Sequence, residues 1–147
     1  MIRKILFATD FSPGSRPALA HAEQLARATR AELLVLHVRE EFPFVSAEGM
    51  GYVPAELDAL QSAAVAALLE EQTGELQTRG VACRGLSVLG APHLRIADVA
   101  AEEKVDIIVL GTHGRNGLGR LFLGSVAERV ARTSAVPVLV VRAPSPS

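Results

Sequence analysis

Short apolar runs alternate along the chain with longer segments in which apolar residues recur at helical spacing. The short runs predict five strands: Arg3–Ala8, Glu32–Val38, Val81–Leu89, Val105–Leu110 and Val136–Val141. The longer segments predict four helices: Ser15–Arg30, Ala55–Arg79, Pro92–Glu103 and Val126–Thr133. Alternation of the two kinds of element is typical of a parallel sheet that is built from βαβ crossovers. The runs Leu33–Val38 and Val105–Leu110 are almost continuously apolar, as expected of strands buried on both faces.

We therefore expect an α/β fold: a three-layer sandwich with an open, five-stranded, mostly parallel sheet and helices on both faces. Ser15 is the expected N-cap of the first helix, with Pro17 in its first turn. The second helix is expected to bury one face, formed by Leu57, Leu60, Ala64 and Leu68, with Leu76 near its end. Between these helices, the Pro- and Gly-containing stretch from Glu40 to Pro54 predicts a long irregular loop.

Length and composition indicate one domain. The 147 residues suit a single unit over residues 1–143, followed by a disordered Pro- and Ser-containing tail at 144–147. A net charge of −1 gives no electrostatic argument for nucleic acid or an anionic membrane. No apolar run reaches the roughly 20 residues that span a bilayer, and the first residues do not resemble a signal peptide, so we expect a cytoplasmic protein. The single cysteine, Cys83, excludes an internal disulfide and a Cys-rich metal site.

Candidate chemistry concentrates in one glycine-rich loop between the fourth strand and the fourth helix. Gly111-Thr112-His113-Gly114 is followed, nine residues later, by Gly124-Ser125. Glycine allows the backbone to approach a ligand closely, and the N-terminus of a helix presents unpaired N–H donors to an anion. The order of strand, loop and helix therefore predicts a site for phosphate. This site would lie at the edge of the sheet where the carboxyl ends of the strands meet. Asp10 and Val38 also stand at the ends of predicted strands.

Two common phosphate-binding patterns do not fit this loop. Gly119 to Gly124-Ser125 has the spacing of a P-loop, but no lysine follows Gly124 to contact the β- and γ-phosphates. The dinucleotide fingerprint fails as well, because Phe122 stands where its third glycine would fall after Gly117-Leu118-Gly119.

The spacing Gly-x2-Gly-x9-Gly-Ser is instead similar to the signature of the universal stress protein family, in its ATP-binding branch. The resemblance covers nearly the whole chain. Ile5–Ser12 resembles the family's first strand and acidic turn, Gly90-Ala91-Pro92 its turn into the third helix, and Val136–Arg142 its closing strand. One departure is Ala91, where the family often has an acidic residue. The resemblance implies a fold of the type shared by Rossmann-like and adenine nucleotide alpha hydrolase-like proteins.

The resemblance also implies a ligand and its contacts. The ligand would be ATP, or ADP or AMP, with Mg²⁺ or Mn²⁺ held through the phosphates rather than by a metal site of the protein. The residues expected to contact it are Ala8, Thr9, Asp10, Val38, Leu110, Gly111, Gly114, Arg115, Gly124, Ser125 and Val126. Within this set, Asp10 would accept from ribose, Val38 and Leu110 would lie beside the adenine, and the glycines with Ser125 and Val126 would hold the ribose and phosphates.

Several of these residues also have a purely structural interpretation. Ser125 and Glu128 have the spacing of a capping box, and Asp10 can cap its own turn with Ser12 and Ser15. Arg115 and Arg120 suit either phosphate or solvent. His113 is expected to be a surface residue and His37 a hydrogen-bonded histidine of the core or its rim, so no catalytic residue is assigned.

The preferred function is a homodimeric, ATP-binding regulatory module of the stress response. Val136–Val141 is an apolar run that begins beside Pro137, which suits an edge strand, and the resemblance implies that this strand pairs with its symmetry mate. Neither a nucleic acid nor a membrane is an expected partner. Two alternatives stay open: a slow ATPase or phosphotransferase, and an interaction protein that works without nucleotide.

Overall fold

The computed structural model describes residues 1–40, 44–46, 49–51, 54–112 and 124–143. Seven strands are present in this part of the chain: β1 (Lys4–Ala8), β2 (Glu32–Arg39), β3 (Phe44–Ser46), β4 (Gly49–Gly51), β5 (Cys83–Leu89), β6 (Ile107–Gly111) and β7 (Val138–Val141). The helices are α1 (Arg16–Thr29), α2 (Ala55–Thr78), α3 (Pro92–Glu102) and α4 (Ser125–Thr133), with a single 3₁₀ turn at Pro13–Ser15 before α1. No helix within the described ranges is both long enough and apolar enough to cross a bilayer.

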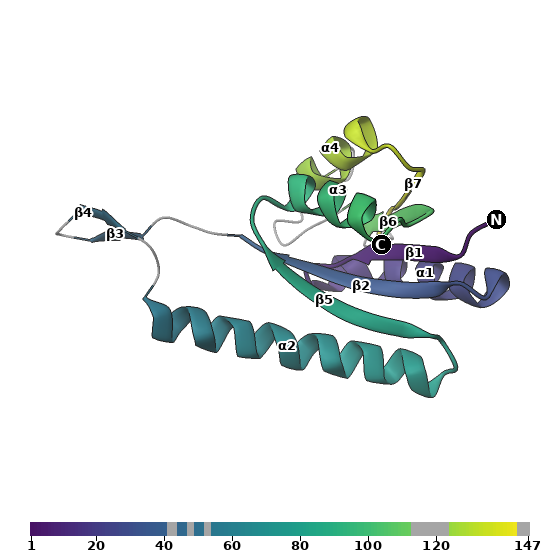
Figure 1. The fold of residues 1–147 in the computed structure, drawn as a ribbon, viewed down its shortest axis with the longest axis horizontal. Coiled ribbons are helices and arrows are strands. Elements are labelled where there is room, and N and C mark those ends of the chain that lie inside the picture. Colours follow the sequence, from purple (N-terminus) through teal and green to yellow (C-terminus); the bar gives the residue numbers. More distant parts are fainter. Residues whose placement is uncertain (41–43, 47–48, 52–53, 113–123, 144–147) are drawn as a thin grey trace.

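The main sheet has five strands in the order β5-β2-β1-β6-β7, and every neighbouring pair is parallel. Leu6 of β1 lies between Leu34 of β2 and Ile108 of β6. This arrangement confirms the predicted α/β fold with a parallel sheet between two helical layers (Figure 1).

Side chains that alternate across the sheet form two separate hydrophobic clusters. Ile5 and Phe7 belong to the cluster that α1 and α2 cover. Leu6 and Leu34 belong to the cluster on the opposite face, which α3 and α4 cover. The alternation follows from strand geometry, because successive side chains point to opposite faces. All four of these core side chains are fully buried.

The connections place a natural binding position at the carboxyl edge between β1 and β6. From β1 the chain builds outward through β2 and β5, and it then returns to the other side of β1 to form β6 and β7. The strand order therefore reverses between β1 and β6. In open α/β sheets, ligands bind outside the carboxyl ends of the strands at such a point.

The stretch predicted to be an irregular loop contains a small hairpin. β3 and β4 pair antiparallel, with Val45 opposite Met50. The prediction of an irregular loop was therefore wrong at Phe44–Ser46 and Gly49–Gly51. The hairpin stands away from the main sheet, beyond the N-terminal end of α2 (Figure 1).

The buried face of α2 also differs from the prediction. Among the five residues expected to face inward, only Leu76 is buried, whereas Leu57, Leu60, Ala64 and Leu68 are exposed. The side chains that α2 does bury are Leu69, Thr73 and Leu76, all in its C-terminal half. That half packs on β5, where the absent side chain of Gly85 makes room for Leu69 and Thr73. Most of the N-terminal half extends past the sheet (Figure 1), and of its residues Val65 packs against the core.

Smaller differences concern where strands begin and end. β6 starts at Ile107 rather than Val105 and includes Gly111, and β5 continues through Gly85 without interruption. Asp106, immediately before β6, explains the late start. Its Oδ2 accepts hydrogen bonds from the N–H groups of Arg3 (2.8 Å) and Lys4 (3.0 Å), and these fix the beginning of β1 against β6.

Candidate functional site

Four of the predicted contact residues belong to the hydrophobic cluster beneath α3 and α4, and three of them lie near the carboxyl ends of neighbouring strands. Leu110 is buried in the cluster beneath α3 and α4. Ala8, Val38 and Val126 are partly buried and pack against the same cluster. They come from β1, β2 and the start of α4, so the fold brings together residues more than a hundred positions apart. A half-exposed apolar group at a sheet edge is suited to a flat apolar ligand group.

Among the described residues, no side chain caps the N-terminus of α4. Gly124 is the N-cap, and the first helical bond runs from the Glu128 N–H to the Gly124 carbonyl (2.9 Å). The N–H groups of Ser125 and Val126 precede that bond, so they have no acceptor inside the helix. The predicted capping box was wrong, because Ser125 is the first helical residue rather than the cap. Glu128 instead pairs with Arg132, one turn along the helix.

Two glycines of the motif are explained by close contacts within the protein. A Cβ on Gly124 would lie 2.3 Å from the carbonyl oxygen of Thr112, and that oxygen accepts a 2.7 Å hydrogen bond from the Gly124 N–H. A Cβ on Gly111 would lie 3.0 Å from the carbonyl oxygen of Gly14, just before α1. Space for a ligand is thus not the only reason for glycine at these positions. The contacts hold the starts of α1 and α4 close to the end of β6.

Asp10 caps its own turn through Ser12, which was the structural alternative to a role in ligand binding. Its Oδ1 accepts a hydrogen bond from the Ser12 N–H at 2.9 Å and another from the Ser12 hydroxyl. The N–H of Phe11 donates to the Thr9 hydroxyl (2.9 Å), and Phe11 has a left-handed backbone with a φ of 63°. A bulky residue rarely adopts that conformation, so these local bonds hold an unfavourable turn in place. The turn is therefore built to fix the position of the Asp10 carboxylate.

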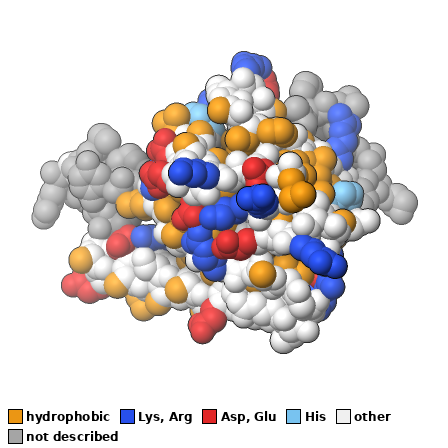
Figure 2. Space-filling model, turned by 45° about the vertical axis from the view of Figure 1, so that its right-hand side comes forward, with side chains coloured by type: hydrophobic (Ala, Val, Ile, Leu, Met, Phe, Trp, Pro, Cys, Tyr) orange, Lys and Arg blue, Asp and Glu red, His pale blue; other side chains and the backbone are white. Residues whose placement is uncertain are grey.

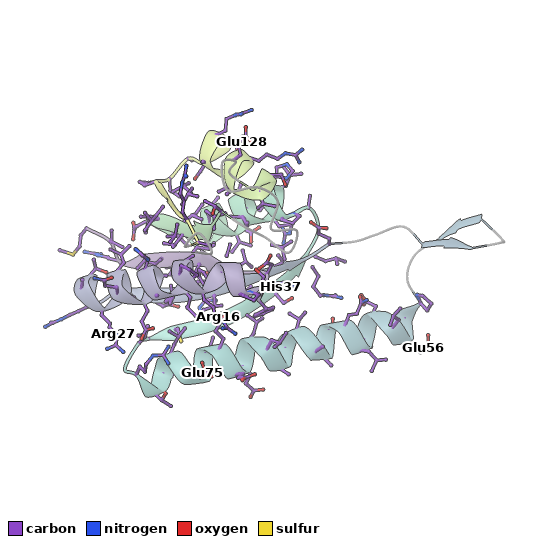
Figure 3. The ribbon with its side chains drawn as sticks, turned by 180° about the vertical axis from the view of Figure 1, so that it is seen from behind. Arg16, Arg27, His37, Glu56, Glu75 and Glu128 are labelled. Atoms are coloured by element: carbon purple, nitrogen blue, oxygen red, sulfur yellow. The ribbon has the colours of Figure 1, made fainter. Side chains whose placement is uncertain are left out.

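His37 lies under this turn and confirms the expectation of a hydrogen-bonded core histidine. It is buried, and its Nδ1 is 2.8 Å from the Thr9 carbonyl oxygen. A carbonyl oxygen can only accept, so Nδ1 carries the proton. The imidazole also packs against the Phe11 ring, with the centroids 4.8 Å apart. Figure 3 shows His37 beside the N-terminal end of α1, where Arg16 begins the helix.

Thr112 is a feature of the site that the sequence analysis did not single out. Its side chain is buried, and its Oγ1 has no hydrogen-bond partner among the residues that the structure describes. Its backbone is fully used, because the N–H donates to Val141 of β7 and the carbonyl accepts from Gly124. Its position inside the glycine motif was visible in the sequence, but the burial of its hydroxyl was not. An unpaired buried hydroxyl next to an open helix N-terminus is a donor available to an anion.

The remaining predicted contacts cannot be placed. Gly114 and Arg115 lie outside the described residues, as do His113 and Arg120, so their predicted roles stay predictions. Within the described ranges, no group of three or more His, Cys, Asp or Glu side chains is placed to hold a metal ion. The polar groups that the site does present are N–H donors, a hydroxyl and one carboxylate acceptor, beside an apolar surface. This combination fits a ligand with anionic, hydroxyl and flat apolar parts.

Comparison with known proteins agrees with this architecture. Residues 1–142 match the model of the universal stress protein family. The chain is 32% identical to Universal stress protein MJ0577 of Methanocaldococcus jannaschii, with 97% of this chain and 96% of the relative covered. It is 34% identical to Universal stress protein YxiE of Bacillus subtilis, over 97% of this chain and 100% of the relative.

Solved structures give the same result. The structure of MJ0577 superimposes with a TM-score of 0.72 at 32% identity and 99% coverage of both chains. A universal stress protein in complex with cAMP superimposes with a TM-score of 0.71 at 28% identity, covering 97% of this chain and 98% of the other. On this similarity of sequence and fold along nearly its whole length, the chain belongs to the universal stress protein family.

Proposed function

We propose that this protein binds ATP at the carboxyl edge between β1 and β6. The observation that carries the proposal is that Ala8, Val38, Leu110 and Val126 belong to one hydrophobic cluster that includes the first turn of α4, where no described side chain caps the helix. The cAMP complex of a relative supports an adenine ligand at this fold. In the proposed complex, Val38 and Leu110 contact the adenine and the fixed Asp10 carboxylate accepts from ribose.

The phosphates are assigned to the N-terminal end of α4 and the loop before it. The N–H groups of Ser125 and Val126 donate to them, with Thr9, Gly111 and Gly124 forming the adjacent backbone. Gly114 and Arg115 complete this set as predictions from the motif. ADP and AMP share the adenosine contacts, and any Mg²⁺ or Mn²⁺ is bound through the phosphates. No residue is assigned a catalytic role.

Calorimetric titration with ATP, ADP, AMP and cAMP in the presence of Mg²⁺ tests the site directly. Asp10→Asn is the sharpest variant, because an asparagine oxygen can still accept from Ser12 and keep the turn, while the charge is lost. We expect saturable binding of ATP and at least tenfold weaker binding by Asp10→Asn. Asp98→Asn, a change on the outer surface of α3, is the matched control. No heat of binding at millimolar ATP would refute the proposal.

We further propose that the protein is a homodimer paired through β7. The carbonyls of Pro137 and Val141 accept hydrogen bonds from β6, so the alternate residues Val138 and Val140 direct their N–H and C=O groups to the open edge. An antiparallel second copy would satisfy both. Val140→Pro removes one outward N–H and is expected to halve the mass measured by light scattering. An unchanged mass would contradict this pairing.

The biological role that follows is regulatory. A nucleotide that joins the end of β6 to the start of α4 fixes the surface on which a partner protein could read the nucleotide state. We place this function in the cytoplasm, as part of the response to stress. Partner capture by the ATP-loaded and ATP-free protein, compared with the Asp10→Asn variant in both conditions, tests it. Equal capture in all four samples would favour an interaction protein that works without nucleotide.

A further inference from the structure

Arg142 follows the last residue of β7 and lies beside Thr112, at the carboxyl edge of the sheet. In the pairing of β6 with β7, Gly111 lies opposite Val141. The pairing continues one residue further, because the N–H of Thr112 donates to the carbonyl of Val141 at 3.0 Å. In parallel strands, such a bond joins a residue to the carbonyl just before its partner. Arg142 is therefore the neighbour of Thr112 across the two strands.

Arg142 and Thr112 lie on the side of the sheet that α3 and α4 cover. Side chains alternate between the two faces along a strand. Leu110 and Val140 both belong to the cluster on that side, so the residues two positions later face the same way. α4 begins there, because the N–H of Gly124 donates to the carbonyl of Thr112 at 2.7 Å. The Arg142 side chain thus starts next to the N-terminus of α4.

The guanidinium of Arg142 has no ion pair in the part of the chain that the structure describes. The residue is exposed, and none of the ion pairs between described residues includes it. Other cations are neutralised within the protein. On the face in Figure 2, Lys and Arg side chains lie among Asp and Glu side chains. Arg84, for example, pairs with both Glu32 and Glu103. Arg142 is instead a cation that can pair with a ligand.

Thr112 is a second, independent sign that an anion binds at this point. Its buried hydroxyl has no hydrogen-bond partner among the described residues. It adjoins both Arg142 and the start of α4, where the N–H groups of Ser125 and Val126 have no acceptor inside the helix. A hydroxyl, open N–H groups of a helix and a guanidinium are the donors that proteins use to bind phosphate.

The strand order puts Arg142 at the phosphate end of the proposed nucleotide. Val38 of β2 is assigned to the adenine and Asp10, which follows β1, to the ribose. The phosphates are assigned to the start of α4, next to the end of β6. Along the sheet these strands follow one another as β2-β1-β6-β7. A nucleotide that lies along the edge therefore approaches β7 with its outer phosphates.

We propose that Arg142 binds the outer phosphates and makes the site selective for a nucleoside triphosphate over a monophosphate. The inference rests on the nucleotide site proposed above, and it adds a residue and a ligand class to that site. The adenosine contacts are the same for ATP and AMP, so they give no preference between the two. A guanidinium donates two parallel hydrogen bonds to phosphate oxygens, and only ATP carries phosphates beyond the first.

Calorimetric titration of matched variants with ATP and with AMP, both with Mg²⁺, tests the inference. Arg142→Gln removes the charge, and the loss of charge-assisted bonds should weaken ATP binding about tenfold. AMP binding should change by less than about twofold. Arg142→Lys keeps the charge without the planar fork, so its ATP affinity should lie between those of the parent and Arg142→Gln. Arg129→Gln is the control, because Arg129 is an exposed arginine of α4 without an ion pair among the described residues.

The results separate this inference from the proposal on which it rests. A parent protein that binds neither nucleotide would overturn both. A parent that binds ATP, with Arg142→Gln weakening ATP and AMP equally or neither of them, would overturn the role of Arg142 alone. The same holds if Arg129→Gln weakens ATP binding as much as Arg142→Gln. Because Arg142 is exposed, urea unfolding of Arg142→Gln should match that of the parent.

The dependence on salt gives a second measurement. Salt screens the attraction between a guanidinium and phosphates, so the preference of the parent for ATP over AMP should fall from about 0.1 M to about 1 M ionic strength. In Arg142→Gln the preference should start lower and fall less. The same salt dependence in both proteins would overturn the inference.

Discussion

The carbonyl oxygen of Thr112 accepts a hydrogen bond from the N–H of Gly124 at 2.7 Å, which joins the end of β6 to the N-terminus of α4. The two backbones are so close that a Cβ on Gly124 would lie 2.3 Å from that oxygen. The bond brings Thr112 and Gly124, at the two ends of the glycine-rich segment, next to each other. It determines where the open N–H groups of α4 point, independently of any ligand.

Gly124→Ala is therefore expected to destabilise the protein even without nucleotide. The added methyl must push two backbone segments apart, and overpacking of this kind costs about 1–3 kcal/mol. Urea unfolding of the nucleotide-free protein measures the loss. Gly74→Ala is the matched control: Gly74 lies inside α2 with nothing within 4 Å of its Cβ position, so alanine should stabilise by up to about 1 kcal/mol. Equal effects of the two substitutions would contradict the close contact.

Thr112→Val should stabilise the nucleotide-free protein. The two side chains have nearly the same shape, and the substitution removes a buried hydroxyl that has no partner among the described residues. Burial of such a group costs about 1–3 kcal/mol, so a gain of about 1 kcal/mol in the free energy of unfolding is expected. Thr112→Ser keeps the hydroxyl and loses the methyl, so it should be less stable than the parent. A less stable Thr112→Val protein would show that the hydroxyl does have a partner.

Two adjacent leucines of α2 should respond very differently to truncation. Leu69 is 6% exposed and packs over Gly85, whereas Leu68 is 43% exposed. Leu69→Ala leaves a cavity and should cost about 2–4 kcal/mol. Leu68→Ala should cost less than about 1 kcal/mol in the dissociated chain. Urea unfolding at low protein concentration, in the Val140→Pro background, compares them. The reverse order would mean that α2 buries the face predicted from its sequence.

The contribution of Asp106 should disappear in acid. Hydrogen bonds from the backbone N–H groups of Arg3 and Lys4 lower the pKa of this carboxyl in the folded protein. A lowered folded pKa stabilises the protein above the unfolded value, about 3.9, and the stabilisation is lost as pH falls through the folded value. Asp106→Asn should thus be less stable than the parent by a constant amount between about pH 5 and pH 7.

As the pH falls below about 4, the free energies of unfolding of Asp106→Asn and of the parent should converge. Unfolding by urea at several pH values measures the difference. Asp98→Asn serves as the control, since Asp98 makes only an exposed pair with Arg95. A difference that persists unchanged to pH 2 would mean that the negative charge of Asp106 is not what stabilises the start of β1.

The alternation of strands and helices was enough to predict the parallel sheet, and the edge that we propose for ligand binding follows from its strand order. Apolar strands such as Leu33–Val38 have one plausible environment, a parallel sheet covered on both faces. The buried face of α2 could not be predicted in the same way. A helix rich in alanine and leucine has apolar residues on several sides, so periodicity does not indicate which side meets the sheet. That depends on Gly85, which lies on another element.

The candidate site, too, could be predicted only in part from the sequence. Val38 and Leu110 were placed correctly at one edge because both end apolar strands. The capping box failed because the helix starts one residue earlier than Ser125-x-x-Glu128 predicts: Gly124, held against Thr112, is the N-cap and Ser125 the first helical residue. The buried hydroxyl of Thr112 depends on packing from several elements, which no local pattern reports.

The central position of β1 has a consequence for how the chain is made. β1 is synthesised first, but the Asp106 side chain that holds its N–H groups follows 103 positions after Arg3. Until then one edge of β1 has no neighbour, although Ile5, Leu6 and Phe7 are apolar, and parallel pairing over so long a separation is slow. On the ribosome, the first two thirds of the molecule must therefore wait, with an open edge exposed, for the last third to emerge. The strand order therefore leaves one edge of β1 without its native neighbour until β6 has been synthesised.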